Sequence, residues 1–414
     1  MKASDISEVK HLYQLDPDRC AIHRISGCFV NGDKTKVVHF TENFLTLPEE
    51  ERFKYLELFR KCLSGTKDKN LLMLRPRQVH RDDHSGDLTG EECKLLQALI
   101  ETDLKDEATL QEFFNHVIES FNYVDNYLIL LARQNYDVPG KTLDGLDLED
   151  ASEEVYRHIL CAVCPVKPTK PGLGYVPSEN AFHNLTPGQI VEMPMNGFLY
   201  PAFIERSQDP DYVLYYTKDT VDIRPDFADA VLGSATPLAA AGQKKSFGNL
   251  LTDTLGEESD LSTVLQIQEN LQTLIREKKE EQESPILGKE DVRVILRDSG
   301  VDEERMKGFD ERFDAVFTMP AEEAAAKEGE ETPGDTEEGS AVSRYPEEIP
   351  IEERIFVASN LVPQRTLEVK NADFTIRINT DRTELLETRV LDGKKCLVIE
   401  LEDGVSVNGI PIRV

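Results

Sequence analysis

Two cysteines in the segment "YRHILCAVCPVKP" have the spacing that most resembles a chemical motif. Cys161 and Cys164 form a C-x-x-C pair, as in thioredoxin-type redox sites and in half of a zinc site. A redox pair opens a helix, whose N-terminus lowers the thiol pKa. Here Asp150-Ala151-Ser152-Glu153 predicts the start of a helix that ends at Cys161, where the dipole disfavours a thiolate. We favour two buried packing thiols, with a zinc or redox site as alternatives.

A second cluster of chemically capable residues is the segment "HRDDH". Its imidazoles and carboxylates are suitable metal ligands; the residues are His80, Asp82, Asp83 and His84. The surrounding residues 75–90 are polar, so we predict a solvated loop. We therefore assign no catalytic residue, no resident metal and no cofactor, and keep this cluster as the starting point of an alternative in which the protein is an enzyme.

Small groups of basic residues are candidates for contacts with phosphates. Lys67 and Lys69 follow a predicted helix, and Lys244 and Lys245 open a later one. Arg75, Arg77 and Arg81 lie in the loop after the strand 70–74. Since the net charge is −31, any contact with a polyanion must be local. Recruitment through a protein partner fits the charge better, and a homo-oligomer is a further possibility for its partners.

The bulk composition places the chain among cytoplasmic proteins. Its 414 residues are enough for two or three domains. Seven irregularly spaced cysteines indicate reduced thiols. The sequence has neither an apolar run of about 20 residues nor a signal peptide at its start, so we expect no membrane partner.

Hydrophobic periodicity predicts the elements that must position these residues. We expect strands in 19–31, 36–40, 70–74, 127–132 and 211–219, and helices after Pro48 and over 110–121. Asn196-Gly197 predicts a hairpin turn within 190–203. Residues 261–275 predict a helix, and a helix pair follows, joined at Ser299-Gly300.

These elements predict an α+β or α/β main body over 1–241 and a helical segment over 242–318. Residues 319–350 are acidic and poor in large apolar groups, which predicts a disordered linker. Residues 351–414 alternate with period two and predict a small β unit, with turns at Asp392-Gly393 and Asn408-Gly409. About 60 residues are marginal for independent stability, so we expect this unit to dock on the main body.

Several segments carry a family resemblance that covers nearly the whole chain. The segments "LTLPEEERFKYLELFRKCLSGTKDKNLL", "EVYRHILCAVCPVKPTKPGLGY" and "VEMPMNGFLYPAFIERSQD" resemble a domain-of-unknown-function family of anaerobic Firmicutes. The order of elements, from "SGTKDKN" and "YLILLA" to a terminal β segment ending in "VNGIPI", is more faintly similar to the bacterial nucleoid-associated protein family. That second resemblance implies association with the nucleoid and contact with DNA.

The sequence therefore favours a cytoplasmic, non-enzymatic binding protein with a nucleoid role implied by resemblance. An enzyme whose site is assembled from distant residues and a protein–protein scaffold are the alternatives.

Overall fold

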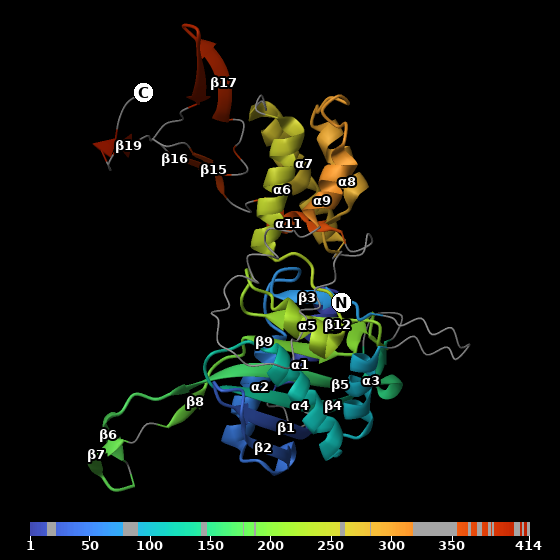
Figure 1. The fold of residues 1–414 in the computed structure, drawn as a ribbon, viewed down its shortest axis with the longest axis vertical. Helices are drawn as coiled ribbons and strands as arrows, with labels where there is room; N and C mark the ends of the chain where they lie inside the picture. The colour runs from blue at the N-terminus through green and yellow to red at the C-terminus, as the bar shows by residue number, and fades with distance from the viewer. Residues whose placement is uncertain are drawn as a thin grey trace, which may run out of the picture. The chain divides into compact units, whose positions relative to one another are not determined.

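The computed structural model describes most of the chain. The described residues are 1–14, 22–77, 90–141, 147–176, 178–185, 188–256, 261–281, 283–317, 354–362, 366–370, 375–379, 382, 385–400, 406–407 and 410–411. They divide into two compact units, Met1–Ala239 and Ala240–Val414, which are considered separately (Figure 1). The predicted linker 319–350 lies outside the described residues, and docking of the β unit stays a prediction.

The first unit is built on one large antiparallel sheet. Its strand order is β2-β1-β4-β5-β9-β12-β3, and β8 pairs with the end of β5. The strands of the unit are β1 (Ile22–Val30), β2 (Lys36–Asn43), β3 (Leu71–Leu74), β4 (Tyr127–Lys141), β5 (Asp147–Pro168), β6 (Gly172–Val176), β7 (Ala181–Leu185), β8 (Gln189–Val191), β9 (Asn196–Tyr200), β10 (Ala202–Ile204), β11 (Ser207–Asp209) and β12 (Val213–Thr217). Because neighbouring strands in this sheet are antiparallel, the α+β prediction is confirmed.

Helices cover both faces of this sheet. They are α1 (Ala3–His11), α2 (Glu49–Cys62), α3 (Glu91–Glu101), α4 (Glu107–Ser120) and α5 (Pro225–Leu232), with a short 3-10 turn, η1 (Phe44–Thr46). Leu96, Phe113 and Phe227 from α3, α4 and α5 pack on one face. Val9 and Phe59 from α1 and α2 pack on the other. The central strands are therefore buried on both sides.

Most predicted elements of this unit are confirmed, including the amphipathic helix around Phe113, now α4. Helix α2 begins after Pro48 as predicted, but no side chain caps it. The predicted helix before Cys161 is wrong, because those residues belong to β5. An apolar run buried on both faces lacks the alternation that marks a half-buried strand, so periodicity could not separate the two.

The predicted hairpin turn at Asn196-Gly197 is also wrong. Both residues lie in β9, between β5 and β12. The buried Asn196 side chain donates to the Tyr215 hydroxyl at 2.6 Å. A Cβ at Gly197 would lie 2.4 Å from the Cys161 carbonyl oxygen and 2.6 Å from the Cys62 sulfur. Glycine here therefore permits close packing rather than a turn.

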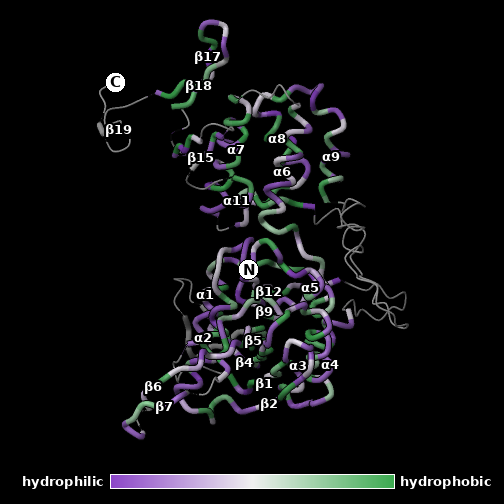
Figure 2. The backbone as a smooth tube through the Cα atoms, turned by 60° about the vertical axis from the view of Figure 1, so that its left-hand side comes forward, coloured by the Kyte–Doolittle hydropathy of each residue, from purple (hydrophilic) through white to green (hydrophobic). Residues whose placement is uncertain are grey.

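The second unit contains amphipathic helices and small strand pairs. The helices are α6 (Ala240–Leu255), α7 (Leu261–Glu280), α8 (Lys289–Asp298), α9 (Phe309–Val316) and α11 (Ala358–Leu361), and hydrophobic and hydrophilic residues alternate along them (Figure 2). The strand pairs are β13 (Ile286–Leu287) with β14 (Phe356–Val357), β15 (Thr366–Lys370) with β16 (Thr375–Asn379), β17 (Leu386–Leu391) with β18 (Lys394–Ile399), and β19 (Ser406–Val407) with β20 (Ile410–Pro411).

An aromatic cluster around Phe356 joins distant parts of this second unit. The Phe356 ring lies 5.4 Å from that of Phe247, 5.8 Å from Phe313 and 5.1 Å from Phe317, measured between centroids. Residues 354–362 thus pack with the helices, and the separate hairpins begin after Val362. The predicted turn at Asp392-Gly393 is confirmed, since both residues have positive φ, whereas Asn408-Gly409 lies outside the described residues.

Gly248 and Gly256 provide a stability test of α6. Gly248 is exposed within the helix and a Cβ there meets nothing within 4 Å, whereas Gly256 follows the helix with φ of +71°. We expect Gly248→Ala to stabilise this unit by about 0.5–1 kcal/mol, because alanine loses less backbone entropy. We expect Gly256→Ala to destabilise it by about 1 kcal/mol, because positive φ strains alanine. Urea unfolding followed by circular dichroism measures both; a stabilising Gly256→Ala would contradict the assigned end of α6.

Candidate functional site

The C-x-x-C pair is part of the core of the first unit. On strand β5 a spacing of three residues places the side chains on opposite faces. Cys161 accordingly packs in the core under α3, α4 and α5, and Cys164 in the core under α1 and α2. Burial raises the pKa of both thiols. The two sulfurs therefore cannot act as one redox or metal-binding pair, and the expectation of buried thiols is confirmed.

Burial makes a direct prediction about thiol reactivity. Cys28, Cys62, Cys93, Cys161 and Cys164 are buried, whereas Cys396 is half-buried. Burial also raises the pKa of Cys28 and Cys93 to about 11, which lowers the thiolate fraction. In a Cys20→Ser background we expect iodoacetamide at pH 8 to label Cys396 at least tenfold faster than any of the other five thiols. Peptide mass spectrometry measures these rates; equally rapid native labelling of Cys161 would contradict the packing.

The histidine and aspartate cluster His80, Asp82, Asp83 and His84 lies outside the described residues, together with Arg81. Within the part of the chain that is described, no group of three or more His, Cys, Asp or Glu side chains could hold a metal ion. No described helix has the length and apolar character of a membrane span.

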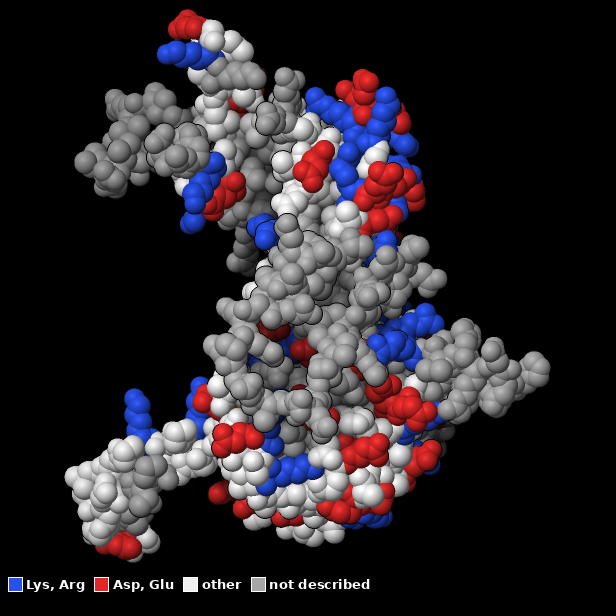
Figure 3. Space-filling model, viewed as in Figure 1, with Lys and Arg blue, Asp and Glu red and all other residues white. Residues whose placement is uncertain are grey.

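The basic candidates that are described come from separate elements. Lys67 and Lys69 precede β3, and Arg75 and Arg77 follow it. Arg77 forms ion pairs with Asp229 and, at 4.0 Å, with Glu92, so its charge is already neutralised. Lys244 and Lys245 are exposed on α6, in the other unit. Acidic and basic side chains are interspersed on the face of the first unit that Figure 3 shows, and nucleic-acid contact stays a prediction.

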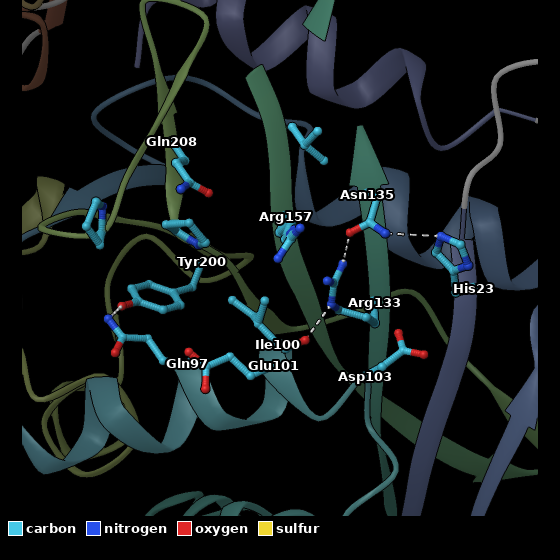
Figure 4. A pocket seen from close by; sticks show the side chains of 13 residues that line it. His23, Gln97, Ile100, Glu101, Asp103, Arg133, Asn135, Arg157, Tyr200 and Gln208 are labelled. Carbon is cyan, nitrogen blue, oxygen red and sulfur yellow. Dashed lines mark hydrogen bonds between the residues drawn. The ribbon is translucent and has the colours of Figure 1, made fainter. Parts of the chain in front are cut away.

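A cavity with many polar side chains in its lining lies in the first unit near the end of α3. Its volume is about 530 Å³, within the range of small-molecule sites. The lining comes from strands β1, β4, β5, β9 and β11 and from helix α3 (Figure 4). The lining residues are His23, Gln97, Ile100, Glu101, Asp103, Arg133, Asn135, Val155, Arg157, Tyr200, Pro201, Gln208 and Pro210.

Arg133 is held rigidly at one wall of this cavity. The residue is only 5% exposed, and its Nε donates to the carbonyl oxygen of Ile100 at 3.0 Å. This bond occupies a carbonyl group at the C-terminal end of α3, where a cation is favoured. Its Nη1 donates to the Asn135 side chain at 2.7 Å. Burial lowers the pKa of Arg133, and the nearby Asp103 charge acts in the opposite direction.

Hydrogen bonds also fix the neighbouring polar side chains. The Asn135 amide nitrogen lies 3.3 Å from Nε2 of His23, which continues the chain of contacts from Arg133 towards β1. On the other side of the cavity, Gln97 donates to the Tyr200 hydroxyl at 3.3 Å. Asp103 lies 3.3 Å from Lys105 Nζ and is thus paired. Contacts within the protein therefore fix these side chains in the walls of the cavity.

Two opposite charges remain available inside this organised lining. Arg157 on β5 and Glu101 at the end of α3 are exposed. Among the described residues, neither side chain has a hydrogen-bond or ion-pair partner, and the two do not pair with each other. Arg157 stands opposite Asn135 on the neighbouring strand. Both charges can therefore contact a molecule that enters the cavity.

Sequence reasoning missed this site, although two signals for it are visible. Arg133-Gln134-Asn135 interrupts the apolar run of β4, and Arg157-His158 interrupts β5. These polar segments lie on paired strands, because Arg133 is the pairing partner of Ile159 and Asn135 that of Arg157. The pairing was hidden because β5 was predicted as a helix.

Fold and cavity together define an α+β protein with an antiparallel sheet, covered by helices on both faces, and a cavity near the end of α3 that contains several charged side chains. The chain matches the family described as "Domain of unknown function (DUF4317)" over residues 1–328 and 335–410, and it belongs to that family. Comparison with curated proteins and with solved structures found no significant match.

Proposed function

We propose that the protein is a non-enzymatic binding protein whose first unit holds a small molecule through an anionic group, a carboxylate or phosphate, at Arg157. The observation that carries this proposal is an exposed guanidinium that has no partner among the described residues, in a cavity whose other polar side chains are held by hydrogen bonds. Guanidinium groups bind carboxylates and phosphates in a bidentate manner. Arg133 lies on the adjacent strand and adds positive potential.

The contacts of the lining side chains favour binding over catalysis. Among the described lining residues, His23 contacts an amide, and no serine, threonine or cysteine stands beside it as a nucleophile. Nucleophilic catalysis generally needs such a pair. The hydrogen bonds of Arg133, Asn135 and Gln97 instead fix these side chains before a ligand arrives. Less side-chain entropy is therefore lost when the ligand binds.

The proposal is tested by thermal unfolding of the full chain in sodium acetate and in sodium phosphate, each against sodium chloride at equal ionic strength. At ten times the dissociation constant a bound anion stabilises the native state by about 1.4 kcal/mol, or about 3–5 °C for a unit of this size. We expect this shift with at least one of the two anions.

The variants decide whether such a shift reports Arg157. We expect it to disappear in Arg157→Ala and to persist in Lys69→Ala, which removes an exposed positive charge from the same unit. Equal shifts in wild type and Arg157→Ala, or no shift with either anion, would overturn the proposal.

A further inference from the structure

We infer that the ligand is zwitterionic: a free amino acid or a short peptide, whose carboxylate contacts Arg157 and whose ammonium group contacts Glu101. This inference rests on the proposed function and names its ligand class. Figure 4 shows Arg157 on the strand side of the cavity and Glu101 on the helix side. A ligand with one charge would satisfy only one of them.

The charged side chains of Arg133 and Asp103 in the lining already have partners within the protein. Arg133 donates to Ile100 and Asn135, and Asp103 is paired with Lys105. Arg157 and Glu101 are thus the pair of opposite charges left for a ligand among the described residues. Since they form no salt bridge with each other, a molecule with separated charges can be placed between them.

The end of α3 independently favours an ammonium group beside Glu101. Glu101 is the last residue of this helix, where the carbonyl groups give a partial negative charge. Arg133 occupies the carbonyl of Ile100, but the carboxylate of Glu101, unpaired among the described residues, keeps a negative charge on this side of the cavity. A polyanion such as a nucleoside triphosphate would be repelled here, whereas a cationic amine would be attracted.

The size and remaining surface of the cavity suit a molecule larger than one small amino acid. The volume of about 530 Å³ leaves space for a dipeptide. Gln97 and Gln208 supply amides that can hydrogen-bond a peptide group, and Ile100, Val155 and Pro201 supply apolar contacts. The cavity therefore offers partners for both termini and for the peptide bond between them.

The test uses the full chain with the twenty common L-amino acids and the twenty dipeptides that begin with alanine. Each compound is also tested in its N-acetylated form and its C-terminal amide form, by thermal shift and then by isothermal titration. We expect at least one free compound to bind, and we expect either blocked form of that compound to bind at least tenfold more weakly.

Two variants assign this discrimination to Glu101. In Glu101→Gln we expect the free and N-acetylated forms to bind within about twofold of each other. Glu91→Gln, the same change at the exposed first turn of α3, should keep the wild-type discrimination. If blocked and free amines bind wild type equally, with binding lost in Arg157→Ala, the zwitterion inference is wrong and the proposed function stands. If no compound binds in any form and acetate and phosphate also fail, both are wrong.

Discussion

Gly197→Ala should destabilise the first unit by about 3 kcal/mol, at the upper end of the cost of overpacking a core. The added Cβ would lie 2.4 Å from the backbone oxygen of Cys161 on β5 and 2.6 Å from the sulfur of Cys62 on α2. Backbone oxygen cannot rotate away, so β5 and β9 would have to separate at the centre of the sheet. Urea unfolding followed by far-ultraviolet circular dichroism measures this loss.

Gly172→Ala is the matched control, because Gly172 lies in the same unit and a Cβ there meets nothing within 4 Å. We expect its free energy of unfolding to stay within about 0.5 kcal/mol of wild type. A similarly small effect for Gly197→Ala would mean that β9 does not pack against β5 and α2 as described.

The second large effect is a loss of stability in acid caused by His158. This side chain is fully buried, and its Nε2 lies 3.0 Å from the Tyr13 hydroxyl. Tyr156 stacks on its ring at 4.3 Å. Burial, with a smaller contribution from the Arg133 charge, lowers its pKa from 6.5 to about 3. Below pH 6.5 the unfolded chain therefore takes up a proton that the native chain does not take up until about pH 3.

The sign of the effect follows from this difference. The contribution of His158 to stability is present above pH 6.5 and falls as the pH is lowered towards 3. Between pH 7 and pH 4.5 we expect it to decrease by about 2–3 kcal/mol. Many carboxylates titrate in the same range, so His158→Gln, which keeps a hydrogen-bonding group for Tyr13, is compared with wild type at each pH.

We expect the His158→Gln profile of unfolding free energy against pH to be flatter than that of wild type by this amount. Parallel profiles would show that His158 takes up a proton over the same pH range in the native and the unfolded chain, and would contradict its burial beside Arg133.

Amphipathic helices and short runs rich in β-branched or apolar residues could be predicted from the sequence. Leu110, Phe113, Phe114 and Val117 repeat with helical spacing, and α4 is found there. Strands β1 and β2 are found within 19–31 and from residue 36 on, where strands were expected, and they pair with each other. By contrast, β5 is buried on both faces between β4 and β9, so its apolar run carries no period.

The candidate site depended on that missed strand. Arg157 and Asn135 become neighbours only through the pairing of β4 with β5, and Glu101 joins them through the packing of α3 on the sheet. Basic residues such as Lys67 and Lys244 were visible as short clusters, but the fold distributes them between different elements and units. The spacing of residues along the chain thus identified groups of charged residues, but it did not indicate which charged residues lie close together in the fold.

The most direct test of the account is a saturation-transfer difference NMR spectrum of acetate with the purified chain. This method detects weak contacts between a small molecule and a protein. The account predicts a saturable acetate methyl signal in wild type and Lys69→Ala that is reduced at least fivefold in Arg157→Ala. An equally strong signal in Arg157→Ala would contradict binding of an anionic group at Arg157, and no signal in wild type would contradict binding of a carboxylate there.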